Sequence, residues 1–222
     1  MLTLQNISLL FLSYLIGSIP TAVWIGTAFY NIDVREHGSG NAGATNTFRV
    51  LGKKAGIPVL ILDVLKGFVA VSLAHLSKYE INTLEFVNLQ LVLGVASLLG
   101  HIFPLFAGFR GGKGIATLLG IVVAVHPQAA SISIGVFLIV FLLSRYVSLG
   151  SMVAAIMFPV SIIIIYQSNI SSLIIFSLVI AILVLITHQK NIERLLRRQE
   201  SKISFRKKDG ITRVETEEED DD

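Results

Sequence analysis

Long apolar segments alternate with short polar stretches along most of this chain. A helix needs roughly 17–25 apolar residues to cross a bilayer. The segments are close to that length, apart from a shorter fourth one that ends at His126 and Pro127. The seven segments cover residues 5–29, 56–77, 86–106, 114–127, 128–145, 147–166 and 171–187. This pattern predicts an all-α, polytopic membrane protein with seven transmembrane helices.

Composition strengthens this prediction and divides the chain. Of the 222 residues, 53% are hydrophobic, and the mean hydropathy is +0.74. Soluble domains are only about 45–50% apolar even when glycine is counted. Nine of the 18 Lys and Arg residues and ten of the 15 acids follow His188. We therefore expect a membrane domain over residues 1–203 and a basic-then-acidic, disordered cytoplasmic tail over 204–222.

The distribution of basic residues predicts the orientation. With seven spans, sixteen of the 18 basic residues fall on one side of the membrane, Lys78 falls on the other, and Lys66 lies within a span. The positive-inside rule then places the N-terminus outside and the C-terminus in the cytoplasm. The polar stretches 33–55, 100–117 and 188–203 all fall on the cytoplasmic face.

The sequence FRGGKGIAT, which precedes the fourth segment, has the composition of an anion-binding loop. Gly111, Gly112 and Gly114 allow backbone N–H groups to approach a ligand, and Lys113 adds a positive charge. The residues that follow begin a helix, whose N-terminus attracts anions. A nucleotide-binding Walker loop requires Ser or Thr after the lysine, where this chain has Gly114. A tight turn whose Arg110 and Lys113 only mark the inner face is the alternative.

The first polar stretch, REHGSGNAGATNTFRVLGKKAG, is rich in glycine and in small polar side chains. Ser39, Asn41, Thr45 and Asn46 are neutral hydrogen-bonding groups, and Arg49 can make a forked contact with a phosphate. This set suits a small polyhydroxy or phosphorylated ligand. The alternative is a solvated loop, because the same residues favour turns. Its length in a compact membrane protein favours a functional loop.

The third polar stretch, HQKNIERLLRRQESKI, directly follows the last apolar segment. On a helix, His188 and Asn191 are three residues apart and share a face. For Arg194, Arg197 and Arg198, a band that faces lipid headgroups is the favoured interpretation.

Asp63 and Lys66, three residues apart in the second apolar segment, are ionisable groups where such groups are costly. Lys66 is therefore a candidate substrate-binding residue, and a structural ion pair with Asp63 is the alternative.

Three stretches, SGNAGATNTFR, GHIFPLFAGFRGGKGIAT and HQKNIERLLRRQESKI, resemble in this order the signature motifs of the bacterial acyl-phosphate:glycerol-3-phosphate acyltransferases. The resemblance covers the chain to about residue 203. It implies transfer of a fatty acyl group from acyl phosphate to the 1-hydroxyl of glycerol 3-phosphate, the first step of phospholipid synthesis, with lysophosphatidic acid and phosphate as products. It also implies an active site on the cytoplasmic face of the cell membrane, no cofactor, no metal ion and no nucleic acid. The enzyme that makes acyl phosphate is a candidate partner.

The resemblance also implies roles for individual residues. Ser39, Arg49, His188 and Asn191 are the catalytic candidates, and Glu200 is the glutamate of the third motif. The substrate-binding candidates are Gly111, Gly112, Lys113, Gly114, Asn41, Thr45, Asn46, His101, Thr117 and Lys66. The family often has lysine in place of Arg110 and commonly has glycine in place of Arg198.

Two questions stay open at this point. The proton of the attacking hydroxyl is taken either by His188 as general base or by the substrate's own phosphate. A carrier for phosphorylated metabolites is the rival function, but the polar groups cluster at one face of the predicted bundle rather than at its midplane. A non-catalytic lipid-binding protein is a third reading.

Overall fold

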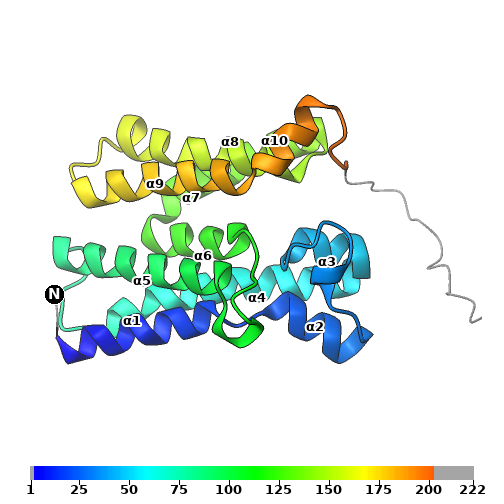
Figure 1. Ribbon diagram of the computed structural model, residues 1–222. Helices are drawn as coiled ribbons and strands as arrows, with labels where there is room; N and C mark the ends of the chain where they lie inside the picture. The colour runs from blue at the N-terminus through cyan, green and yellow to red at the C-terminus, as the bar shows by residue number, and fades with distance from the viewer. Residues whose placement is uncertain (1–2, 203–222) are drawn as a thin grey trace, which may run out of the picture.

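The computed structural model describes residues 3–202, and all regular secondary structure in that range is helical (Figure 1). The all-α class is therefore confirmed for this part of the chain. The tail predicted over 204–222 lies outside the described residues. The α-helices are α1 (Leu4–Gly17), α2 (Thr21–Tyr30), α3 (Ala44–Leu51), α4 (Lys53–Ser72), α5 (Leu84–Ile102), α6 (Ile115–Val125), α7 (Pro127–Ser144), α8 (Val147–Val160), α9 (Ser171–Thr187) and α10 (Gln189–Leu196). The short turns are the 3₁₀ helices η1 (Val34–Glu36), η2 (Leu73–Leu76) and η3 (Leu105–Ala107), and the π-helical turn η4 (Ser161–Ile165).

The helices differ in whether they are long enough to cross a membrane. Within residues 3–202, four helices are long and apolar enough to cross a membrane by themselves. The number rises to six if two bent pairs, α1 with α2 and α9 with α10, each count as one span. The helix α6 has only 11 residues. The count of seven spans therefore stays a prediction. The four helices that are long and apolar enough by themselves cover Lys53–Leu76, Leu84–Ala107, Pro127–Ser144 and Val147–Ile165.

The first apolar segment differs from the single helix expected over 5–29. It forms α1 and α2, which are bent by 41° across a short break. Pro20 stands in this break and directly precedes α2. Proline lacks a backbone N–H and its ring clashes with the preceding turn, so a helix cannot continue through it without a kink or a break.

The helices form two layers (Figure 1). The first contains α1, α4, α5 and α6, and the second contains α7, α8 and α9, with α8 packed against both of its neighbours. Helices α4 and α6 approach so closely that a Cβ at Gly67 would overlap the Thr117 carbonyl, and a Cβ at Gly120 would overlap the Val64 carbonyl. The apolar core joins the layers, since Ile121 of α6 shares one cluster with side chains of α8 and α9.

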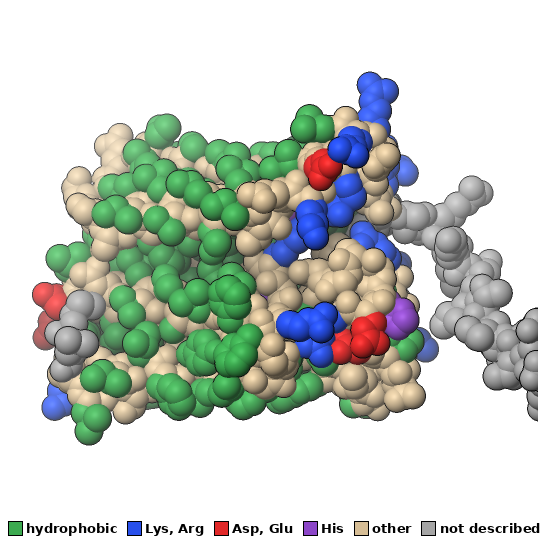
Figure 2. Space-filling view, in the orientation of Figure 1, with side chains coloured by type: hydrophobic (Ala, Val, Ile, Leu, Met, Phe, Trp, Pro, Cys, Tyr) green, Lys and Arg blue, Asp and Glu red, His purple; other side chains and the backbone are tan. Residues whose placement is uncertain are grey.

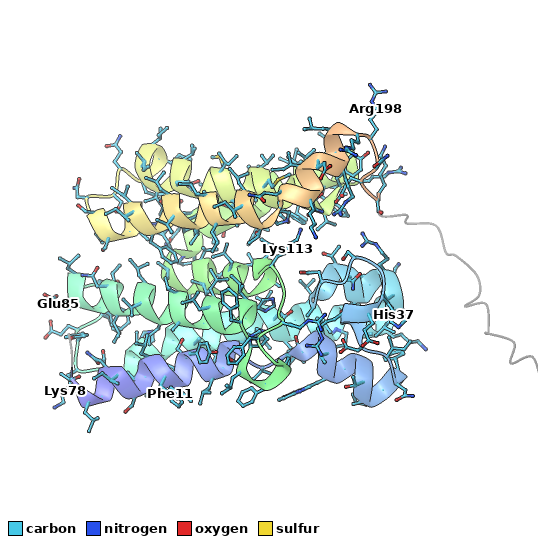
Figure 3. All side chains as sticks on the ribbon, in the orientation of Figure 1. Phe11, His37, Lys78, Glu85, Lys113 and Arg198 are labelled. Carbon is cyan, nitrogen blue, oxygen red and sulfur yellow. The ribbon has the colours of Figure 1, made fainter. Side chains whose placement is uncertain are left out.

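The surface matches what a bilayer requires. Figure 2 shows apolar side chains over the middle of the molecule and Lys and Arg side chains gathered at the end where α2, α3 and α10 lie. Lys78 and Glu85 mark the opposite end, whereas His37 and Arg198 lie at the basic end (Figure 3). Exposed apolar side chains between the ends, such as Phe11, would face lipid tails.

Candidate active site

The first polar stretch folds around the buried side chain of Asn46, which is 1% exposed. Its amide oxygen accepts hydrogen bonds from the backbone N–H of Ser39 at 2.8 Å and from the Ser39 hydroxyl at 3.1 Å. Its amide nitrogen donates to the carbonyls of Val34 at 2.7 Å and His37 at 3.0 Å. Gly38 closes this turn with a φ of +63°, and a side chain there would overlap Asn46. Asn46, a predicted substrate-binding residue, is therefore used in shaping the loop that presents Ser39.

The other candidates of this stretch are more accessible. Ser39 is exposed, and Asn41 is half-buried. Thr45 and Arg49 are both exposed on α3 and are four residues apart, so they share one face of that helix. The stretch can therefore offer a hydroxyl from the loop and a hydroxyl and a guanidinium from α3.

The glycines of the second motif pack their loop closely against the end of α5. The N–H of Gly111 donates to the Ile102 carbonyl at 3.2 Å, and the N–H of Gly112 donates to the His101 carbonyl at 3.3 Å. These two N–H groups are therefore used inside the protein, contrary to the expectation that they approach a ligand. A Cβ at Gly112 would overlap Nε2 of His101 and would lie 2.7 Å from the carbonyl oxygen of Ala42. The two glycine-rich stretches thus touch each other at Gly112.

The helix predicted after the second motif is present and begins at Ile115. Gly114 precedes it with a φ of +78°, a left-handed conformation that favours glycine. Within the described part of the chain, no side chain caps this helix. Its positive end is therefore available to attract an anion next to Lys113.

Lys113 connects the two helical layers. Its ammonium group donates to the amide oxygen of Asn191, and the amide nitrogen of Asn191 donates to Oε1 of Glu200 at 2.6 Å. In Figure 3, Lys113 lies between the layer that holds α6 and the layer that leads to α10. Burial, followed by the nearby charge of Arg194, lowers the pKa of Lys113 to about 8. The charged form is thus poorly solvated, so an incoming anion would stabilise it.

Glu200 holds three donors from two helices. It accepts hydrogen bonds from the Ser148 hydroxyl at 2.7 Å, from Asn191, and from Nε of Arg194 at 2.7 Å. Burial raises the pKa of Glu200, but these hydrogen bonds outweigh that effect and bring the pKa below its usual value. Arg198 makes the turn before Glu200 with a φ of +57°, the conformation for which glycine is favoured.

His188 is 4% exposed and lies in the bend between α9 and α10. Its Nδ1 is 2.8 Å from the carbonyl oxygen of Val184. A carbonyl can only accept, so Nδ1 carries the proton and Nε2 keeps a free lone pair. Burial, with the nearby charge of Lys113, lowers the pKa of His188 to about 4. His188 is therefore neutral at physiological pH.

Three further predicted residues lie beneath the loops in a buried group. Lys66 forms an ion pair with Asp63 at 2.8 Å, with only 5% of its side chain exposed. Nδ1 of His101 is 3.0 Å from the hydroxyl of Thr117. The structure brings Lys66, His101 and Thr117 near one another, with their polar atoms directed into the protein.

Arg35 joins the two glycine-rich stretches, and it is not among the site residues predicted from the sequence. Its guanidinium forms an ion pair with Asp33 at 2.6 Å and donates to the carbonyl of Ala107 at 2.8 Å. The hydrogen bond with Arg35 is the main cause that lowers the pKa of Asp33. In the sequence, Arg35 could have been noticed as the partner of Asp33, an opposite charge two residues earlier, at the start of the first glycine-rich stretch.

A basic, glycine-lined site at one end of an apolar helical bundle suits phosphorylated ligands at a membrane surface. The family model described as glycerol-3-phosphate acyltransferase matches residues 7–198. The chain belongs to the glycerol-3-phosphate acyltransferase family, and it is an integral membrane acyltransferase of phospholipid biosynthesis. The rival interpretation as a metabolite carrier is not retained.

The relatives match over nearly their whole length. The glycerol-3-phosphate acyltransferase of Chlorobium phaeobacteroides is 42% identical and covers 92% of this chain and 98% of its own. The enzyme of Chlorobaculum tepidum is 38% identical, with 92% and 99% covered. A crystal structure of PlsY (YgiH), an integral membrane glycerol 3-phosphate acyltransferase, in its glycerol 3-phosphate form has a TM-score of 0.79 at 39% identity, and 90% of this chain and 96% of that chain are covered. The lysophosphatidic acid form has a TM-score of 0.77 at 39% identity, with 90% and 95% covered.

Replacing Glu200 by glutamine should impair catalysis, because Asn191 would lose the carboxylate that holds it in place. A neutral amide has one oxygen and cannot accept from Ser148, Asn191 and Arg194 together. Lost hydrogen bonds to a charged group are worth about 1.5–3 kcal/mol, so we expect Glu200→Gln to lower kcat/KM for acylation of glycerol 3-phosphate by about 10- to 100-fold.

The matched control is Glu193→Gln on α10, the helix that also carries Asn191. The Glu193 side chain is 58% exposed and pairs with Arg197. Exposed pairs contribute little, so activity should stay within about twofold of the parent enzyme. Equal activities of the two variants, measured at matched protein concentration, would show that Glu200 does not orient Asn191.

The pH dependence of activity should report Lys113. Lys113 is charged below its pKa of about 8 and loses its proton above it, so attraction for phosphorylated substrates is present at neutral pH and declines as the pH rises. We expect kcat/KM to fall through this alkaline range, since that parameter reports groups of the free enzyme. Lys113→Arg should remove this decline because a guanidinium stays protonated above pH 12. An unchanged alkaline limb in Lys113→Arg would assign the titration to another group.

Proposed function

We propose that this enzyme transfers a fatty acyl group from acyl phosphate to the 1-hydroxyl of glycerol 3-phosphate. The products are 1-acyl-glycerol 3-phosphate, which is lysophosphatidic acid, and inorganic phosphate. The observation that carries the proposal is the meeting of Lys113, at the open end of α6, with Asn191 and the neutral His188. One region thus combines a cation for a phosphate with a base for a hydroxyl.

Two groups of residues suit two phosphorylated substrates. Ser39, Thr45 and Arg49 suit glycerol 3-phosphate, because hydroxyl and guanidinium groups match its hydroxyls and phosphate. Lys113 and the N-terminus of α6 suit the phosphate of the donor. The related PlsY structures, in glycerol 3-phosphate and lysophosphatidic acid forms, support the acceptor and the product.

The chemistry needs no further activation, because acyl phosphate is a mixed anhydride. The oxygen of the 1-hydroxyl attacks the acyl carbonyl carbon, the bond to the phosphate oxygen breaks, and inorganic phosphate leaves with the electron pair. Two anions must come together, and Lys113, Arg49 and Arg110 offset their repulsion. Correct mutual orientation can supply about 7–11 kcal/mol of the barrier. The chain contains no cysteine, and a direct transfer is simpler than an acyl-enzyme.

The hydroxyl proton has two candidate acceptors. Nε2 of His188 has a free lone pair, since Nδ1 is bonded to the Val184 carbonyl. A phosphate oxygen of the substrate is the other acceptor, and His188 would then orient the acceptor with Asn191. The acyl phosphate itself must come from an acyl-phosphate-forming enzyme, which is a candidate partner.

The test is a defined assay with purified protein, glycerol 3-phosphate and palmitoyl phosphate, without ATP or coenzyme A. We expect release of phosphate in amounts equal to the lysophosphatidic acid formed. A general base contributes about 10²- to 10⁴-fold to the rate. If His188 takes the proton, His188→Gln should therefore lower kcat by at least about 100-fold. Retention of most activity would assign the proton to the substrate's phosphate. Acylation from palmitoyl coenzyme A but not from palmitoyl phosphate would overturn the proposed donor.

The proposal includes the orientation in the membrane. We infer that the chain crosses seven times, with the N-terminus outside and with the active site and C-terminus in the cytoplasm. The support is the contrast between the basic end, where Arg198 lies, and the opposite end, where Lys78 lies (Figure 3).

Single cysteines can test this orientation, because the parent chain has none. Lys78 and Lys54 are both exposed and lie near opposite ends of α4 and η2. A membrane-impermeant maleimide added to intact spheroplasts should label Lys78→Cys and spare Lys54→Cys until the membrane is opened. The reverse labelling pattern would invert the proposed topology.

A further inference from the structure

A buried polar cluster lies beneath the two glycine-rich stretches, and no step of the proposed reaction uses it. Asp63 and Lys66 come from α4, His101 from α5, and Thr117 from α6. Their exposed fractions are 1%, 6%, 6% and 0%. Burying ionisable groups among apolar helices is costly, so such a cluster calls for a function or a compensating structural role.

One side of the cluster holds the break between α1 and α2. The ammonium of Lys66 donates to the Ile19 carbonyl at 2.9 Å and pairs with Oδ1 of Asp63 at 2.8 Å. The hydroxyl of Thr21 donates to the same carboxylate oxygen at 2.7 Å. The residues on both sides of Pro20 are therefore tied to α4.

The other side of the cluster supports the glycine-rich stretches through His101. Nδ1 of His101 contacts Thr117 at 3.0 Å and lies 3.7 Å from Asp63 Oδ1. Its Nε2 faces Gly112, where a Cβ would overlap it, and its carbonyl accepts the N–H of Gly112 at 3.3 Å. Because Gly112 also lies against Ala42, the imidazole lies directly beneath the contact between the two stretches.

A small cavity lies between the buried cluster and the two glycine-rich stretches. It is lined by Ile19 and Lys66 from the cluster side, by Ala42 and Gly111 from the two stretches, and by His101 between them. The cluster therefore adjoins both stretches from the side facing the helical bundle, while Ser39 and Arg49 are exposed.

We propose that His101, Lys66 and Asp63 are positioning residues for acyl transfer. They fix the first glycine-rich stretch relative to the second, so that the residues for the two substrates keep one separation and orientation. They touch neither substrate. The inference rests on the proposed function in one respect, namely that the two stretches hold the two different substrates.

Positioning of this kind has its own kinetic signature. Each stretch can still bind its own substrate when their mutual placement is disturbed, but the reacting atoms are then misaligned. A displacement of about 1 Å can cost about 100-fold in rate. We therefore expect kcat to fall while the two KM values change little. A residue that contacts one substrate would raise only that KM, and a purely structural residue would lower the thermal midpoint without changing kcat per folded enzyme.

The experiment compares two substitutions of His101 in full-length protein reconstituted in lipid nanodiscs. The amide of asparagine reaches the position of Nδ1, and that of glutamine reaches the position of Nε2. His101→Asn keeps the contact with Thr117 but loses the support of Gly112, and His101→Gln does the reverse. His101→Asn should lower kcat at least about tenfold, with both KM values within about threefold, whereas His101→Gln should keep kcat within about fivefold. His75→Gln, at an exposed histidine of η2, is the matched control and should match the parent enzyme.

The charged pair gives a second test that avoids a misfolded single variant. Removing one partner would leave a buried charge uncompensated, so Asp63→Asn and Lys66→Met are combined. The double variant should fold, which its thermal midpoint reports, and should lower kcat by about tenfold with unchanged KM values, because the bond to the Ile19 carbonyl is lost.

Two results would overturn the inference. One is a selective rise of about tenfold in a single KM in the His101 variants, which would make His101 a substrate contact. The other is an unchanged kcat per folded enzyme in both His101→Asn and the double variant, which would make the cluster structural. The donor is established first with the parent enzyme. A donor other than acyl phosphate would contradict the proposed function, yet the same variants assayed with that donor still decide the positioning role.

Discussion

The hydrogen bond from Lys113 to Asn191 joins the two helical layers, and the rest of the site is arranged around it. Lys113 belongs to the loop before α6 in one layer, and Asn191 belongs to α10, which follows α9 in the other. Glu200 holds Asn191 in place, while the charge of Lys113 helps to keep His188 neutral. The candidate site is therefore assembled only when both layers are docked, so we expect catalysis to depend on their packing.

Close backbone approach explains why glycine is needed where the stretches meet. Gly112 fits between the imidazole of His101 and the carbonyl of Ala42, and Gly67 allows α4 to approach Thr117. These contacts are supported by buried charges that a protein optimised only for stability would replace with apolar side chains. Buried charges in an apolar bundle are expected where function limits the choice of residue.

Much of the fold, and the position of the candidate site at its basic end, could be predicted from the sequence. Lipid-embedded backbone must satisfy its own hydrogen bonds, so apolar segments of this length had to be helical, and the three motifs lie at the ends of those helices. The break at Pro20 escaped prediction because its compensation by Lys66 is a contact between distant parts of the chain. The sequence also cannot distinguish a side chain that binds a ligand from one used in its own loop, which is the case for Asn46. The contact of Glu200 with Asn191 depends on a left-handed turn at Arg198, a residue type that rarely adopts it.

The shortness of α6 has a consequence for how a lipid substrate is handled. Its 11 residues span about 16 Å, roughly half of the hydrocarbon thickness, and Figure 3 shows Lys113 set inward from the end where His37 and Arg198 lie. In the proposed reaction, a donor phosphate bound at that depth would leave its acyl chain among the lipid tails. Lifting a chain into water costs about 0.8 kcal/mol per methylene, or roughly 12 kcal/mol for sixteen carbons. An acyl donor bound in this way would not have to leave the lipid in order to react.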